Sequence, residues 1–125
     1  MHSVVTYNSD QIEMWLSAFV ITSVIEMPVY LRALRYTDHS QTNKILISLT
    51  PSIVTHPLIW WGIPPLINQI SISEVSYYLL VEVIAVLGEY FFLKKLKCNS
   101  ALSTSLIANG CSATLGSYLF DIYYF

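Results

Sequence analysis

Five polar residues lie in stretches of the sequence that are otherwise apolar, and they are the residues most able to do chemistry: Glu26, His56, Glu82, Glu89 and Asn109. Three carboxylates and one imidazole can relay protons, bind a cation or form a reaction centre. The alternative is architectural, because polar side chains inside apolar helices hydrogen-bond one another and fix the register of the helices. The residue types alone leave both interpretations open.

Metal binding and nucleophilic catalysis have weaker support from the spacing of these residues. Three glutamates and a histidine suit iron, manganese or zinc, but the Glu-x-x-His pairs of a di-iron bundle are missing. Ser52 lies one turn before His56, yet serines are frequent in these stretches, so the spacing is not specific. Cys98 and Cys111 have no CxxC spacing and are expected to be free thiols. We therefore predict no cofactor and keep a metal as a minor alternative, and an enzyme that acts on lipid stays as a third alternative behind the two functions compared below.

The elements that position these residues are apolar enough for a membrane. Of the 125 residues, 54% are hydrophobic and only 11% are charged, whereas soluble domains carry about 25% charged residues. Four stretches approach the length of about 20 apolar residues that a membrane span requires. They cover about 13–34, 45–67, 75–93 and 101–120. Because the connections are short, the sequence predicts an all-α, antiparallel four-helix bundle, a single transmembrane domain over 1–125.

The basic residues indicate how such a bundle is oriented. All six fall at the first and third connections: Arg32, Arg35, Lys44, Lys94, Lys95 and Lys97. Since basic residues are retained on the cytoplasmic side, both termini are predicted to lie outside. The expected location is a cytoplasmic membrane, crossed several times, with the lipid bilayer as the main solvent. No basic face is present that would indicate nucleic-acid binding.

The depths of the five polar residues predict two layers. Glu26 and Glu89 each lie a few residues from a basic cluster, about 8–9 Å from the cytoplasmic face. His56, Glu82 and Asn109 lie about 12–18 Å deep, near the midplane. Glu82 and Glu89 are seven residues apart, which places them on one face of the third span.

A stripe of small and polar residues runs along the last span. Ser105, Asn109, Ser112 and Gly116 are separated by four, three and four residues, so they share one helical face. Small residues in such a stripe allow a second helix to approach closely, and Asn109 can hydrogen-bond across the contact. We predict that this face packs against another helix.

Aromatic residues and prolines shape the outer ends of the first two spans. Trp15, Trp60 and Trp61 are expected to anchor the protein at the outer headgroups. Prolines within the second span remove backbone hydrogen bonds and predict a kink. Pro64 and Pro65 are expected to end its regular helix.

Four segments, "IEMPVYLRAL", "THPLIWW", "VEVIAVLGEYFFLKK" and "SLIANGCSATLGS", resemble those of small uncharacterised bacterial four-helix inner-membrane proteins. The shared features are an acid before proline, a Thr-His-Pro-x-x-Trp element, two acids seven apart and an Asn-containing last span. The resemblance implies a bacterial inner membrane and transfers no activity. Its matching positions are Glu26, His56, Pro57, Glu82, Glu89 and Asn109.

Two functions compete at this point. In the first, the protein is an accessory or assembly subunit of a larger membrane complex or a homo-oligomer, and its polar cluster holds the helices in register. In the second, the cluster transports protons, a cation or a small solute, with Glu82 and Glu89 as carriers and His56 as the switch. Four spans enclose little volume for a pathway, which favours the first.

Overall fold

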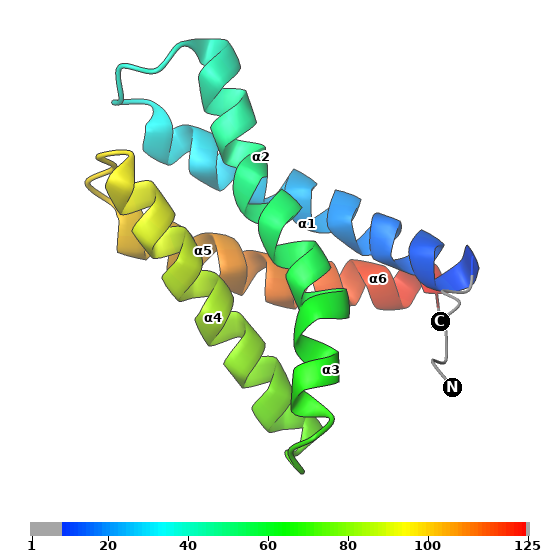
Figure 1. Ribbon diagram of the computed structural model, residues 1–125. Helices are drawn as coiled ribbons and strands as arrows, with labels where there is room; N and C mark the ends of the chain where they lie inside the picture. The colour runs from blue at the N-terminus through cyan, green and yellow to red at the C-terminus, as the bar shows by residue number, and fades with distance from the viewer. Residues whose placement is uncertain (1–8, 125) are drawn as a thin grey trace.

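The computed structural model describes residues 9–124, with Phe120, Tyr123 and Tyr124 described by their backbone alone. In this part of the chain, helices are the only regular secondary structure (Figure 1). Two helices are uninterrupted, α1 (Ser9–Leu34) and α4 (Glu74–Lys95). The predicted all-α class is confirmed.

The other two helical rods each contain a π-helical turn, in which the backbone hydrogen bonds run to the fifth residue along. The rod between α1 and α4 consists of α2 (Gln41–Pro57), η1 (Leu58–Gly62) and α3 (Ile63–Ile67). The last rod consists of α5 (Ala101–Cys111), η2 (Ser112–Gly116) and α6 (Ser117–Tyr124). The four predicted spans therefore each lie inside one rod.

Pro64 and Pro65 do not end the second rod, so that expectation was wrong. They lie in the first turn of α3, which begins at Ile63 directly after η1. Because α3 continues directly from η1, the carbonyls that the missing proline N–H groups would bind need other donors, and the Ile59 carbonyl accepts a hydrogen bond from the Tyr77 hydroxyl at 3.1 Å. The irregularity lies one turn earlier, after Pro57, where the π-helical turn absorbs the disruption.

Helix α1 occupies the centre of the fold. It packs against α2 on one side and against α5, η2 and α6 on the other, while α4 packs against α5. Figure 1 shows the α5–α6 rod lying beside α1 and running in the opposite direction, so that the start of α1 and the end of α6 lie at the same end. The α2–α3 rod crosses α1 obliquely and meets α4 at the connection between them.

The distribution of polar residues is inverted relative to a water-soluble protein. Among the side chains that the structure describes, ten polar or charged ones are buried, compared with nine apolar ones. Large apolar side chains face outward, among them Val24 (65% exposed), Leu66 (69%) and Val75 (69%). Water would disfavour so much exposed apolar surface, whereas lipid favours it and requires the polar groups to turn inward.

Three helical segments are long and apolar enough to cross a membrane: Ser9–Leu34, Gln41–Ile67 and Glu74–Lys95. Their length and composition, together with the apolar exterior, are those of a helical membrane protein.

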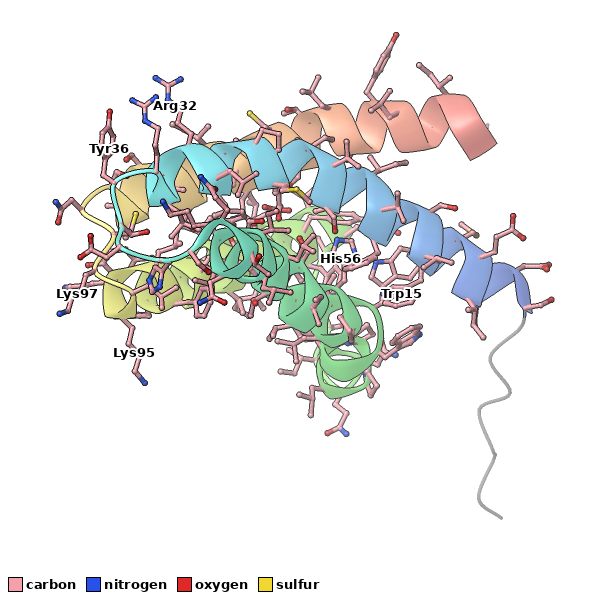
Figure 2. All side chains as sticks on the ribbon, turned by 90° about the horizontal axis from the view of Figure 1, so that it is seen from above. Trp15, Arg32, Tyr36, His56, Lys95 and Lys97 are labelled. Carbon is pink, nitrogen blue, oxygen red and sulfur yellow. The ribbon has the colours of Figure 1, made fainter. Side chains whose placement is uncertain are left out.

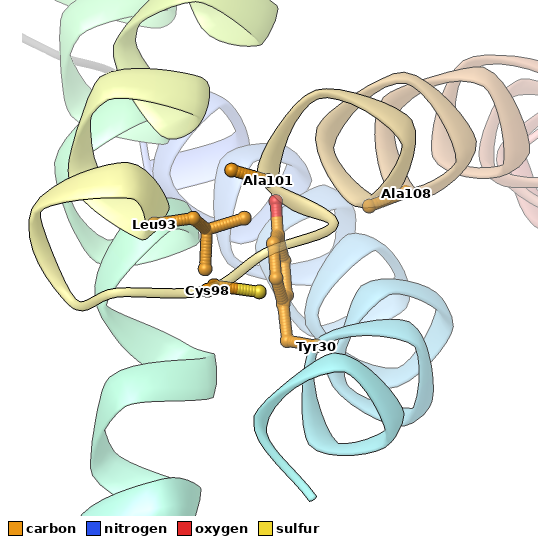
Figure 3. Close-up of a cluster of buried hydrophobic side chains, with 5 residues drawn as sticks. All are labelled: Tyr30, Leu93, Cys98, Ala101 and Ala108. Carbon is orange, nitrogen blue, oxygen red and sulfur yellow. The ribbon is translucent and has the colours of Figure 1, made fainter. Parts of the chain in front are cut away.

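A small apolar cluster lies at the end of the fold that contains the α1–α2 and α4–α5 connections. Figure 3 shows the Tyr30 ring of α1 beside Leu93 and Cys98, with Ala101 and Ala108 of α5 close by. Tyr30 and Leu93 are fully buried. The alanines leave room for the Tyr30 ring between α1 and α5.

The turn that carries Cys98 into this cluster ends α4 in a Schellman motif. Lys97 has a left-handed backbone conformation (φ 60°). The Cys98 N–H donates to the Leu93 carbonyl at 3.1 Å, and the Lys97 N–H donates to the Lys94 carbonyl at 3.0 Å. The motif reverses the chain within a few residues, so that α5 can pack against α4.

Lys97→Gly is expected to raise the stability of the protein by about 1 kcal/mol, because glycine adopts the left-handed conformation without the steric cost of a side chain. The matched substitution Lys95→Gly, at the last residue of α4, is expected to lower stability by about 0.5 kcal/mol, because the backbone there is helical. Unfolding of the detergent-solubilised protein, followed by circular dichroism, measures both. A loss of stability in both variants would contradict the assigned turn.

Candidate functional site

Glu26 connects three helical segments. Its side chain is 2% exposed. One carboxylate oxygen, Oε2, accepts a hydrogen bond from the Ser52 hydroxyl of α2 at 2.9 Å. The other, Oε1, accepts from the Ser112 hydroxyl at the start of η2 at 2.7 Å. Both oxygens of this carboxylate are therefore bound by hydroxyls from the two segments that flank α1.

Glu89 forms the equivalent connection on α4. It is also 2% exposed, and its Oε2 accepts hydrogen bonds from the Tyr30 hydroxyl of α1 and from the Asn109 amide of α5. The Asn109 amide donates as well to the Ser105 carbonyl at 2.9 Å, which holds it in place. The other carboxylate oxygen of Glu89, Oε1, is buried without a hydrogen-bond partner among the described residues.

The two carboxylates and their donors form one network, here called the carboxylate network: Glu26, Tyr30, Ser52, Glu89, Asn109 and Ser112. Glu26 and Tyr30 are one turn apart on α1, and Asn109 and Ser112 are one turn apart on the last rod. The Ser112 hydroxyl lies 3.1 Å from the Asn109 carbonyl, which joins the two halves. The network links α1, α2, α4 and the last rod.

The counted depths predicted that Asn109 lies in a separate midplane layer with His56. In the structure, Asn109 lies with the carboxylates instead. Side chains in an α-helix lean toward the N-terminal end of their own helix. Glu89 on α4 therefore leans away from the α4–α5 turn, while Asn109 on α5 leans toward it. Counting residues from the turn places the two Cα atoms at different depths, and the opposite tilts bring the side chains together.

His56 lies apart from the carboxylates in an aromatic row between α1 and the second rod. Its ring meets the edge of Phe19 at 5.6 Å between centroids. Phe19 stacks on Trp15 at 5.7 Å, and Trp15 contacts Trp61 at 4.8 Å. The Nδ1 atom of His56 is buried and has no hydrogen-bond partner in the described part of the chain.

The three tryptophans that were predicted as anchors differ in their contacts. Trp15 and Trp61 pack against each other and join α1 to η1, and Trp60, next to Trp61 in η1, is partly buried. Figure 2 shows Trp15 and His56 well separated from the end of the molecule where Arg32, Lys95 and Lys97 lie. The tryptophans therefore lie toward the end opposite the basic one.

Glu82 does not join the carboxylate network. It lies two turns from Glu89 on α4 and is only partly buried. No hydrogen bond from a described backbone or side-chain group reaches its carboxylate. Glu82 lies in the first half of α4. The contact between α4 and α5 at Ser105 comes after it, where the Ser105 hydroxyl donates to the Val86 carbonyl at 2.8 Å.

The small and polar stripe of the last rod faces its neighbours. Ser105 contacts α4, Asn109 contacts Glu89, and Ser112 contacts Glu26. At Gly116, which is buried, an added Cβ would lie 3.8 Å from the Ile25 side chain of α1. The stripe thus lies against both α4 and α1.

Tyr30 is the participant that the sequence reasoning missed, and Ser52 was not expected to bind Glu26. Tyr30 lies four residues after Glu26, and Ser52 lies in the series Lys44, Ser48, Ser52 that follows every fourth residue of α2. All five of these side chains are buried. Polar residues at helical spacing beside a glutamate were the available signal.

No group of three or more His, Cys, Asp or Glu side chains within residues 9–124 is arranged to hold a metal ion. Four buried polar atoms in the same range lack hydrogen-bond partners: Trp15 Nε1, Ser23 Oγ, His56 Nδ1 and Glu89 Oε1. Three of them belong to α1 and α2 where those helices face each other. Buried atoms of this kind ordinarily bind water or another polar group.

Comparison with protein-family models, curated proteins and solved structures finds no match for this chain. The fold and the site define a class: an all-α protein with three helices suited to span a membrane and a buried carboxylate network at its centre. Any function must be argued from this network and from the surface around it.

Ser112→Ala removes one of the two hydroxyl donors to Glu26 and leaves a buried carboxylate oxygen unbonded. We expect a loss of about 1–3 kcal/mol in stability. Ser117→Ala is the matched control, because the Ser117 hydroxyl is exposed and bonds only to its own helix at the Ala113 carbonyl. It should change stability by less than about 0.5 kcal/mol. Equal effects, measured as thermal unfolding in detergent, would show that the Glu26 contact contributes nothing.

Proposed function

We propose that this protein is a small integral membrane subunit that assembles with a second copy of itself or with a larger membrane complex through the face of α4 that carries Glu82. In this proposal the carboxylate network holds the four rods together, and Glu82 lies at the contact with the partner. The single observation that carries the proposal is the Glu82 carboxylate in the middle of an apolar helix, which no group in the described part of the chain binds.

The proposal places all four rods across the membrane, the last one through α5, η2 and α6, with both chain ends outside. The distribution of charge supports this orientation, because Figure 2 shows Arg32, Lys95 and Lys97 at one end of the molecule. Basic residues of short connections are retained on the cytoplasmic side. The resemblance described above favours a bacterial inner membrane.

The hydrogen bonding of the network supports an architectural role. Glu26 and Glu89 each receive two donors, and the four donors come from α1, α2, α5 and η2. Each contact between membrane helices contributes on the order of 0.6–2 kcal/mol. Several of them acting together select one packing of helices whose other contacts are made by small side chains.

Glu82 provides the argument for a partner. A carboxylate at the centre of a membrane helix costs about 2.5–3.5 kcal/mol and is normally satisfied by a polar group or a hydrated cavity. Glu26 and Glu89 have such groups within the chain, while Glu82 has none among the described residues. The apolar residues that precede it on α4, Val75 (69% exposed) and Leu79 (63%), leave this half of the helix open to a neighbour.

Glu82→Leu is expected to abolish the assembly while leaving the chain folded, because the leucine removes a carboxylate that none of the described residues binds. The native size in mild detergent, measured by light scattering, should fall to that of a single chain. Glu74→Leu, at the exposed first turn of α4, is the control and should retain the larger size.

A wild-type protein that is a single chain in detergent and also purifies alone from membranes after cross-linking would contradict the proposal. So would unchanged assembly in Glu82→Leu.

A second candidate is proton transfer through the bundle, and the unpaired buried atoms favour it. Glu89 Oε1, Ser23 Oγ and His56 Nδ1 all lie inside the protein without hydrogen-bond partners among the described residues. Water molecules bound to these atoms would form a hydrogen-bonded path along the interior, with Glu89 and Glu82 as carriers and His56 as the switch.

If this second candidate holds, Glu89→Gln should lower proton uptake into vesicles containing the purified protein by about a hundredfold, because an amide keeps the shape but cannot exchange a proton. Glu82→Gln should act in the same direction. Glu13→Gln, at the exposed start of α1, should leave uptake unchanged. A pH-sensitive dye inside the vesicles reports the rate. Uptake no faster than in protein-free vesicles would exclude proton transfer and leave the assembly proposal intact.

A further inference from the structure

A groove of about 640 Å³ opens between the last two turns of α1 and the first two turns of α5. It lies at the basic end of the molecule, outside the carboxylate network. Arg32 and Arg35 line it from α1 and the following turn, and Ser103 and Thr104 line it from α5. Pro28 and Ile107 form its apolar part.

The two arginines in this groove have no acidic partner among the residues that the structure describes. Neither forms an ion pair with a carboxylate in the described part of the chain, which contains every aspartate and glutamate of the sequence. Both side chains are exposed, and Figure 2 shows Arg32 projecting from the end of α1 beside Tyr36. Two unneutralised guanidinium groups three residues apart are suited to bind a phosphate, because each presents several N–H donors in one plane.

The neighbouring groups add to the positive potential. The Lys44 ammonium donates to the Arg35 carbonyl at 3.3 Å from α2. The Arg35 side chain donates to the Tyr36 hydroxyl, and this hydrogen bond, with the charges of Arg35 and Arg32, lowers the pKa of Tyr36 from its ordinary value. On the opposite wall, α5 begins at Ala101, so its first backbone N–H groups lie near Ser103. Asp38 is the one acidic residue in the α1–α2 connection and is exposed.

The groove is polar at one end and apolar at the other. Arg32 and Arg35 lie where α1 ends, whereas Pro28 lies one turn deeper, about 6 Å along the helix. On α5, Ser103 lies near the turn and Ile107 one turn deeper, and Ile107 is 54% exposed. On both walls, therefore, the lining of the groove changes from charged or polar side chains near the turn to apolar side chains toward the middle of the helices.

We propose that this groove is a binding site for one anionic phospholipid, whose phosphate lies between Arg32 and Arg35 and whose acyl chain lies along Pro28 and Ile107. A free phosphate would use the guanidinium groups but not the apolar walls. A neutral lipid would use the walls but leave the arginines without a counter-charge. Basic pockets between membrane helices near the cytoplasmic surface bind anionic headgroups in this manner. The inference does not depend on the assembly proposed above.

The test uses the full-length protein in mixed micelles that contain either phosphatidylglycerol or phosphatidylcholine, with native mass spectrometry to count bound lipid. We expect one phosphatidylglycerol per chain, bound at least about tenfold more tightly than phosphatidylcholine. The double variant Arg32→Gln/Arg35→Gln should lose roughly tenfold or more of this affinity. Lys95→Gln/Lys97→Gln removes the same charge at the same end of the molecule but outside the groove, and should change affinity by less than about threefold.

A third variant tests the apolar part of the site and keeps the test decisive if the arginine variant folds poorly. Ile107→Trp fills the groove while leaving both arginines in place, and it should also weaken phosphatidylglycerol binding. Equal losses in the two double variants would overturn the proposal in favour of diffuse surface charge. Equal binding of the two lipids, or displacement of phosphatidylglycerol by millimolar inorganic phosphate, would overturn it as well.

Discussion

The hydrogen-bonding requirement of groups shielded from water determines most of this structure. In lipid, an unpaired polar group costs several kcal/mol, so each such group must find a partner inside the protein. The exterior of this chain is apolar, and the buried positions are occupied to a large extent by serine, threonine, asparagine and glutamate. Helix association therefore rests on the hydrogen bonds of Glu26 and Glu89 and on small side chains that allow close approach, and only to a minor extent on a conventional apolar core.

The central position of α1 follows from this arrangement. Glu26 and Tyr30 lie one turn apart on the same face and bind partners on α2, η2 and α4. A helix that supplies both an acceptor and a donor from neighbouring turns can hold several helices at once. The apolar cluster around Tyr30 and Leu93 then excludes water from the end of the network that lies near the α1–α2 and α4–α5 connections.

Much of the fold could be predicted from the sequence, because lipid imposes a length and a composition on each span. The helix boundaries and the packing stripe Ser105–Gly116 depend on local spacing, which the sequence displays directly. The pairing of Asn109 with Glu89 could not be predicted in the same way, because it depends on the opposite tilts of side chains on two helices. Tyr30 was missed because a tyrosine in an apolar stretch looks like an ordinary lipid-facing aromatic. Pro64 and Pro65 were misjudged because nothing in the sequence shows that a π-helical turn precedes them.

The two π-helical turns have a consequence for how the chain tolerates change in length. A π-helical turn accommodates one residue more than the α-helix around it, which rotates everything beyond it by about 100° relative to an unbroken α-helix. Deleting a single residue between Ser112 and Gly116 would therefore remove the surplus and leave an ordinary α-helix in which Gly116 still faces Ile25, with Ser105 and Asn109 in place. Each π-helical turn thus absorbs a one-residue surplus, in the last rod at Ser112–Gly116 and before α3 at Leu58–Gly62.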